Sequence, residues 1–288
     1  MQKRQYQIDM CNGPLWSKIL LFALPLMASS ILQLLFNAAD VVVVGQFVGK
    51  EALAAVGSNT SLINLMVNLF VGLSVGTNVV VARDLGAGRH DNVSRSIHTS
   101  VALSLVSGVV MLVFGVVMAR QLLIWMSSPT DVIDLATVYL RIYFLGMPAN
   151  LLYNFSAAIL RAQGDTQRPL YYLTAAGVVN VILNLLLVIV FGLGVAGVAL
   201  ATITAQYISA ALVIRCLMKE EGALRLELKK LRMEWSVVKR ILQVGLPAGF
   251  QGVVFALSNV VIQSSLNSFN DSVIVAGSSA SANIEGFV

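Results

Sequence analysis

Long uncharged stretches, separated by short charged segments, dominate the chain. The stretch between Lys18 and Asp40 holds 21 uncharged residues, and residues 169–214 form an uncharged run of 46. One helix that crosses a bilayer needs about 20 predominantly apolar residues, so the run of 46 has room for two. The uncharged runs predict membrane helices at 16–44, 53–81, 96–119, 133–160, 169–191, 196–218 and 238–266, with an eighth that starts near 273.

The length of these runs favours helices over the strands of a membrane barrel. Such strands need only about 10 residues and alternate between apolar and polar side chains. The runs here are longer and apolar on most faces, and a helix satisfies its own backbone hydrogen bonds in lipid. The fold class is therefore an all-α polytopic membrane protein.

Composition and charge agree with this class and predict an orientation. The chain is 57% hydrophobic and 11% charged, whereas a soluble domain carries about 25% charged residues. If the N-terminus is cytoplasmic, 16 of the 19 Lys and Arg residues lie in inner segments, and only Lys50, Arg120 and Arg141 lie on the outer half. This positive-inside bias predicts a multi-pass protein of the cell membrane with a cytoplasmic N-terminus. Because topology explains the net charge of +5, no nucleic-acid partner is expected.

The first part of the chain recurs near its end. The segment Lys18–Pro25 returns as Arg240–Pro247, an offset of 222 at which Asn37 also meets Asn259. Six predicted helices separate the copies, so both copies run in the same direction, as in repeats related by an axis along the membrane normal. The expected domains are a six-helix lobe over 1–218, a charged and helical cytoplasmic linker over 219–239, and the start of a second lobe over 240–288. We interpret the linker as a solvated connector, with a lipid-binding segment as the alternative.

Two acids stand inside these uncharged runs, where a charge costs about 2.5–3.5 kcal/mol on insertion scales. Asp40 lies in the first predicted helix, and Glu285 lies about 12 residues into the eighth. An intramembrane acid predicts a protonatable or cation-binding carboxylate, so Asp40 is a candidate Na⁺ ligand. The alternatives are a structural hydrogen-bond partner, or a residue at the membrane interface if the first helix ends early.

Polar side chains spaced by one or two turns accompany these acids. Residues three, four or seven apart share a helical face, and such polar stripes face a cavity or one another. The candidates are Gln33 and Asn37 on the first predicted helix, Asn150 and Asn154 on the fourth, Asn180 and Asn184 on the fifth, and Thr202 and Gln206 on the sixth. A carboxylate among amides and hydroxyls suits Na⁺, a proton or a cationic ligand. The alternative is hydrogen bonding between helices, at about 0.6–1.7 kcal/mol per pair.

Prolines mark places where the predicted helices can bend. Pro25 and Pro247 lie inside the first and seventh helices, and Pro148 lies inside the fourth. Each frees a backbone carbonyl and permits a bend, so Pro25 and Pro247 are predicted hinges. The sequence has no Walker-type phosphate loop, and neither His90 nor His98 has a ligand partner at metal spacing. We therefore expect neither an enzyme nor a bound cofactor.

Several motifs resemble the multidrug and toxic compound extrusion (MATE) family of transporters. The motifs, in chain order, are Leu24-Pro25-Leu26 followed by Asp40 and Gly45, the run Ala52-Leu-Ala-Ala-Val-Gly57, Gly86-Ala-Gly88, the run Arg161-Ala-Gln-Gly-Asp-Thr166 with Arg168-Pro169, and the run from Gly192 to Thr202. They are similar to the first helix, the loops, and the junction of the fifth and sixth helices in that family. Their order and spacing cover nearly the whole chain.

The resemblance implies a fold and an activity. The family has two six-helix lobes, 12 transmembrane helices in all, which face a central cleft. Its members export cationic, drug-like organic compounds in exchange for H⁺ or Na⁺, so the expected mechanism is secondary antiport by alternating access. The expected partners are an organic cation and membrane lipids. The expected oligomeric state is a monomer, and no cofactor is expected apart from H⁺ or Na⁺ as the coupling ion. On this reading the chain holds the N-terminal two-thirds of the transporter.

The resemblance also implies site residues. In the family an aspartate on the first helix couples transport to the ion, and Asp40 matches it. Asn180 and Thr202 match two further members of that site, whereas Asn184 stands where archaeal-type members have Asp. The remaining polar residues become candidates for the substrate cleft: Gln33, Asn37, Asn150, Asn154, Gln206 and Glu285.

Two other readings stay open at this point. A lipid-linked saccharide flippase of the same superfamily tends to carry basic residues that face its cavity, and Arg141 is the candidate for that role. A receptor with seven helices belongs to a different class, and the cytoplasmic N-terminus and the 222-residue repeat argue against it.

Overall fold

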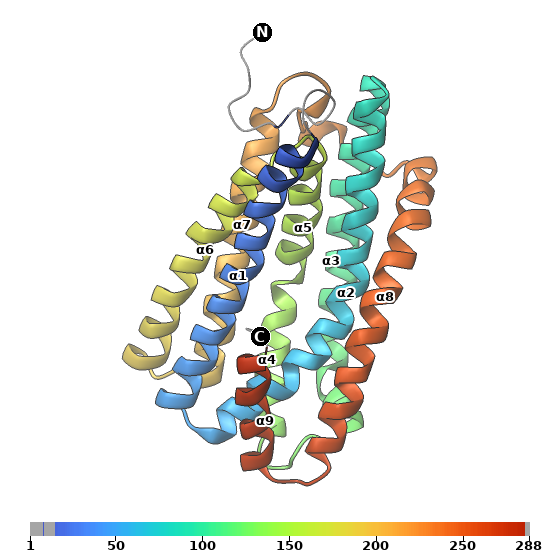
Figure 1. Ribbon diagram of the computed structural model, residues 1–288. Coiled ribbons are helices and arrows are strands. Elements are labelled where there is room, and N and C mark those ends of the chain that lie inside the picture. Colours follow the sequence, from blue (N-terminus) through green and yellow to red (C-terminus); the bar gives the residue numbers. More distant parts are fainter. Residues whose placement is uncertain (1–7, 9–14, 286–288) are drawn as a thin grey trace.

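The computed structural model describes residue 8 and residues 15–285. Side chains are described for residue 8 and for residues 16–282. Its described elements are all helical and run up and down one bundle (Figure 1). They are α1 (Leu15–Phe47), α2 (Lys50–Gly86), α3 (His90–Trp125), α4 (Ile133–Leu145), α5 (Met147–Ala162), α6 (Gln167–Leu185), η1 (Leu186–Val190), α7 (Gly194–Lys219), η2 (Gly222–Leu224), η3 (Leu228–Lys230), α8 (Trp235–Asn267) and α9 (Ser272–Glu285). We call the end with residues 219–235 the linker end and the opposite one the far end.

The predicted spans are found with one correction. Six helices of the described part are long and apolar enough to cross a membrane, and the pair α4 and α5 makes a seventh span if the two count as one. The span predicted over 133–160 is divided into two helices, because α4 and α5 meet at a bend of 47° near Pro148, where a bend was predicted to be possible. Pro148 stands in the first turn of α5, where proline lacks a donor and biases the residue before it away from helical geometry.

The segment predicted as a helix over 169–191 also changes character before its end. The α-helix α6 stops at Leu185, and the π-helix η1 follows directly. The chain then turns at Gly192 and Gly194, whose φ angles of 64° and 55° are freely accessible only to glycine. These glycines form the turn between the two spans, and the π segment before them was not predicted.

The prediction that the linker is helical is wrong. Residues 220–234 form two single 3-10 turns, η2 and η3, joined by extended backbone. Leu224 and Leu226 are both buried, and they pack against Ile97 of α3 and Leu217 of α7 in one cluster. Residues two apart face the same side only in an extended chain, so burial of this pair selects an extended linker over a helical one.

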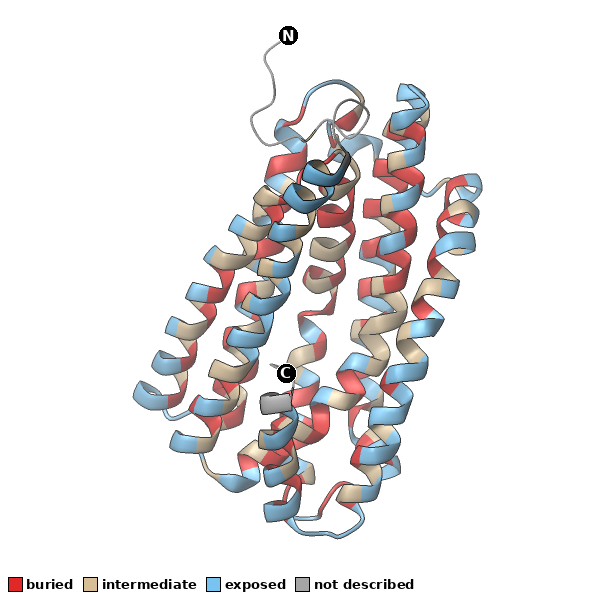
Figure 2. Ribbon diagram, in the orientation of Figure 1, coloured by how far each residue is buried: buried red, intermediate tan, exposed pale blue. Residues whose placement is uncertain are grey.

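Apolar side chains face outward along most of the bundle. Leu20, Leu24, Met27 and Ile31 of α1 are each at least half exposed, and exposed positions run along the outer faces of the helices in Figure 2. In water such a surface would drive aggregation, whereas in lipid it is the expected outer face of a membrane helix. The chain is therefore a multi-pass membrane protein.

Helices α2 and α8 lie against each other along the bundle (Figure 1). A Cβ atom added to Gly72 would come within 2.2 Å of the backbone of Gly249, and one added to Gly76 within 2.4 Å of the carbonyl oxygen of Ile241. Near the linker end, Arg240 of α8 donates to the buried carboxylate of Asp84 on α2 at 3.0 Å. Glycines and one ion pair thus join two helices that lie far apart in the sequence.

Candidate functional site

Asp40 occupies a buried position in α1, with 9% of its surface exposed. It precedes the far end of α1 by seven residues, or about 10 Å along the axis. Asn184 of α6 donates to one carboxylate oxygen, and the Thr202 hydroxyl of α7 donates to the other at 3.4 Å. No ion pair neutralises Asp40 among the described residues.

The partners of Asp40 are connected to one another. Asn184 also donates to the Asn180 side chain at 3.4 Å, and Asn180 donates to Thr202 at 3.5 Å. The Thr202 hydroxyl lies 3.0 Å from the carbonyl oxygen of Val198. Asn180 and Asn184 stand one turn apart on α6, where Asn184 bonds to α1 at Asp40 and Asn180 bonds to α7 at Thr202. The structure therefore brings together four predicted residues: Asp40, Asn180, Asn184 and Thr202.

The π-helix η1 begins two residues after Asn184. A π segment widens the helix by about one residue per turn. Such segments are rare in proteins, and those that occur are often found at functional sites. It changes the direction of the residues beyond Asn184 without interrupting the span. The polar face of α6 thus ends where the regular helix ends.

The oxygen atoms of this site fit a monovalent cation or a proton. Asn184 has a buried side-chain oxygen with no hydrogen-bond partner. The Asn184 side-chain nitrogen donates to Asp40, so the amide has to turn over before this oxygen can join the Asp40 carboxylate and the Thr202 hydroxyl as the oxygen ligands that hard cations prefer. Among the described residues, no group of three or more His, Cys, Asp or Glu side chains gathers as a metal site would require. The set carries a single acid, so one positive charge is enough to neutralise it.

Two tyrosines that sequence reasoning missed lie next to this network. Tyr139 and Tyr143 of α4 stack with ring centroids 6.1 Å apart, and both stand within electrostatic reach of Asp40. Gln206 of α7 donates to the Tyr143 hydroxyl at 3.5 Å. The sequence carried one signal for this pair: two tyrosines, each with a polar hydroxyl, stand four residues apart shortly before Pro148.

The other predicted cleft residues lie apart from this network. Gln33 and Asn37 are exposed on α1, so sharing a helical face with Asp40 does not bury them. Asn154 donates to the main-chain and side-chain oxygens of Asn150 at 2.9 and 3.1 Å. No hydrogen bond of the described residues joins that pair to Asp40. Glu285 ends α9, and its side chain lies outside the described residues.

The predicted hinge prolines both lie inside unbroken helices. Pro25 is within α1 and Pro247 is within α8, and each of these helices has 33 residues. The Ser29 hydroxyl donates to the carbonyl oxygen of Pro25 at 2.8 Å. The bend between α4 and α5 falls at Gly146, two residues before Pro148, which the sequence also predicted to permit a bend.

Six of the described helices are long and apolar enough to cross a membrane, and the bundle encloses Asp40, an acid with no ion pair among the described residues. The chain is therefore a polytopic membrane protein with a polar site inside its spans. Residues 25–186, more than half of the chain, match the sequence profile of the family described as MatE. The chain belongs to the MATE family of transporters, and the resemblance seen in its motifs is confirmed.

Relatives in this family include efflux proteins. The chain is 28% identical over 268 residues to a probable multidrug resistance protein, YoeA of Bacillus subtilis, which covers 91% of this chain and 58% of YoeA. It is 25% identical over 276 residues to a FAD transporter of Shewanella oneidensis, at 92% and 59% coverage. An inward-facing multidrug resistance MATE transporter of known structure superposes with a TM-score of 0.81 at 26% identity, covering 88% of this chain and 57% of that one. The chain thus spans less than two-thirds of the length of these relatives.

Proposed function

We propose that this chain forms the first part of a secondary antiporter that exports cationic, drug-like organic compounds in exchange for H⁺ or Na⁺. The observation that carries the proposal is Asp40, a buried acid with amide and hydroxyl partners and no ion pair among the described residues. A charge in such a place is costly, so the site favours taking up a proton or a small cation. A residue that changes its charge state inside a span can couple ion movement to transport.

The proposed full protein has 12 transmembrane helices in two six-helix lobes. Residues 1–218 make the first lobe, residues 219–239 the linker, and residues 240–288 begin the second. The relatives, of which the chain covers 58% and 59%, support a longer protein. The repeat supports two lobes, because α2 begins at Lys50 and α9 at Ser272, an offset of 222 that equals the offset between Pro25 and Pro247.

The proposed orientation places the linker end in the cytoplasm of a cell whose plasma membrane holds the protein. Most Lys and Arg residues then lie inside, as the positive-inside rule favours. Asp40, about 10 Å from the far end of α1, is then close to external water. An ion or proton from outside has a short path to its carboxylate.

Coupling requires that Asp40 interact differently with two conformations of the transporter. We propose that ion or proton uptake at Asp40 changes its hydrogen bonds with Asn184 and Thr202. These bonds join α1 to α6 and α7, and the linker half of α1 is otherwise largely exposed. Loss or gain of the bonds therefore changes how firmly α1 is held in the bundle, with Pro25 as the proposed hinge.

A vesicle assay tests this function. The complete transporter is reconstituted and loaded with a fluorescent organic cation or, separately, with FAD, and an inward gradient of Na⁺ or of H⁺ is then imposed. We expect the cation to leave the vesicles only under a gradient of one of these ions. Export of FAD in place of the cation would contradict the substrate class, and export that ignores both gradients would contradict antiport.

A further inference from the structure

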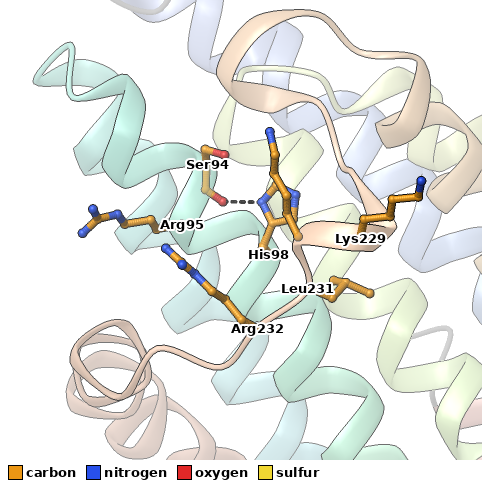
Figure 3. A pocket seen from close by; sticks show the side chains of 7 residues that line it. Ser94, Arg95, His98, Lys229, Leu231 and Arg232 are labelled. Carbon is orange, nitrogen blue, oxygen red and sulfur yellow. Dashed lines mark hydrogen bonds between the residues drawn. The ribbon is translucent and has the colours of Figure 1, made fainter.

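A basic pocket lies at the linker end, away from Asp40. It is a cavity of about 460 Å³ between the first turns of α3 and the linker (Figure 3). Its polar lining is Ser94, Arg95 and His98 of α3 with Lys229, Lys230 and Arg232 of the linker. We call it the linker pocket. Its volume is within the range of about 300–1,000 Å³ that small-molecule sites occupy.

Hydrogen bonds fix the linker side of the pocket. The His98 ring is buried; its Nδ1 lies 2.7 Å from the Ser94 carbonyl oxygen, and its Nε2 accepts the backbone N–H of Glu227 at 3.1 Å. The Thr99 hydroxyl donates to the carbonyl oxygen of Arg232 and accepts the N–H of Glu234, both at 3.3 Å. The linker backbone is therefore held on α3 before any ligand arrives, which lowers the entropy lost on binding.

Positive charge exceeds negative charge in the pocket. Its four cationic side chains face two acids: Glu234 pairs with Arg232 at 2.5 Å and with Arg95 at 4.0 Å, and Glu227 pairs with Lys230 at 2.8 Å. Lys229 makes no ion pair within the described part of the chain, and it is exposed. In Figure 3, Arg95 and Arg232 lie on one side of the His98 ring and Lys229 lies on the other.

The excess of positive charge lowers the pKa of the Glu227 carboxyl. The hydrogen bond from Lys230 is the largest cause that lowers the pKa of the Glu227 carboxyl, and the charges of Lys230 and Arg225 act in the same direction. A second anion that enters the pocket meets the same cations. Arginine and lysine donors of this kind bind phosphate groups, arginine often through two parallel bonds.

The position of the pocket on α3 selects a lipid as the source of the phosphate. The uncharged run of α3 begins at Thr99, so the pocket stands where the helix enters the apolar layer. Val106 and Val109 are 11 and 14 residues beyond Arg95, on the same helical face, and both are 52% exposed. A phosphate at Arg95 thus has an apolar stripe directly below it, as a phospholipid with its acyl chains requires.

We propose that the linker pocket binds the phosphate of an anionic phospholipid headgroup and so holds the linker against α3. Basic clusters beside a membrane helix attract anionic lipids, by about 1 kcal/mol per Lys or Arg. The linker connects α7 to α8, so the bound lipid stabilises the connection between the two parts of the chain. The proposal takes up the alternative reading of the linker, as a lipid-binding segment.

Lipid titration of the purified protein tests the proposal. Phosphatidylglycerol or phosphatidylcholine is added in detergent, and binding is read by native mass spectrometry and by the melting temperature. The pocket variant is Lys229→Gln with Arg232→Gln, and the control is Lys219→Gln with Arg225→Gln, which removes two charges near the pocket but not from its lining. We expect phosphatidylglycerol to bind the pocket variant about 30-fold more weakly than the unchanged protein and the control.

Other outcomes overturn the proposal. Equal loss of binding in the control would show general charge attraction and no site. Inorganic phosphate is titrated in parallel, and if it binds as tightly as the lipid and with the same sensitivity to the variants, the ligand is a soluble phosphate. If the double variant does not fold, Lys229→Gln alone decides, because this exposed side chain makes no ion pair in the described part; unchanged lipid affinity in that variant contradicts the proposal.

Discussion

Asp40 combines burial with polar partners, and no ion pair reaches it within the described part of the chain. Its two oxygens accept hydrogen bonds from Asn184 and Thr202, which come from two different helices. Neutral donors reduce the cost of burying a carboxylate, but they leave its charge in place. In the proposed function, the same residue takes up either a proton or a cation. The same donors orient the carboxylate, so its position is set by α6 and α7 as much as by α1.

Asn184→Asp tests whether oxygen ligands around Asp40 determine cation binding. The variant places a second acid beside the first, so we expect Na⁺ to bind at least about tenfold more tightly than in the unchanged protein. The measurement is the rise in melting temperature with Na⁺, with choline replacing Na⁺ at constant ionic strength. Asn154→Asp is the matched control, since Asn154 bonds to Asn150 and not to Asp40. Equal responses of the two variants would refute a specific cation site at Asn184.

At the scale of helices, the sequence predicted which segments are spans better than it predicted where the helices bend or become irregular. The uncharged runs placed the spans because lipid demands a minimum apolar length. Of the predicted polar residues on the fifth and sixth spans, Asn184 and Thr202 bond to Asp40, Asn180 bonds to Thr202, and Gln206 bonds to Tyr143. The π-helix η1 and the extended linker were not predictable in this way. Both depend on what neighbouring helices offer: the linker is extended because Leu224 and Leu226 find an apolar cluster on α3 and α7. Tyr139 and Tyr143 were missed because their approach to Asp40 needs the break before α5.

Contact between α2 and α8 depends on the lack of side chains at glycine. Gly72→Ala would place a methyl group 2.2 Å from the backbone of Gly249, and overpacking of this kind destabilises by about 1–3 kcal/mol. The melting temperature in detergent measures the loss. Gly86→Ala is the control in the same helix, since a Cβ there meets no atom within 4 Å. If both variants melted like the unchanged protein, the close approach of α2 and α8 would be wrong.

At the scale of the molecule, one polar site lies toward the far end and one basic pocket lies at the linker end. The first lies among α1, α6 and α7, while the second joins α3 to the segment that leads into α8. Between them, α2 and α8 are joined by glycine packing and by the ion pair of Asp84 with Arg240. A change in how α1 is held at Asp40 can therefore alter the bundle without breaking the contact that joins α2 to α8.

The most direct test of the account is ion-driven export by the Asp40→Asn variant of the complete transporter in vesicles. Asparagine keeps the size and the hydrogen-bonding capacity of the side chain but neither takes up a proton nor carries a charge. Asp131→Asn is the control, because it removes an exposed acid of the far end. We predict that the Asp40 variant inserts and melts like the unchanged protein, while its gradient-driven export falls to that of empty vesicles and the Asp131 variant stays active. Normal gradient-driven export by Asp40→Asn would contradict the assignment of Asp40 as the coupling residue.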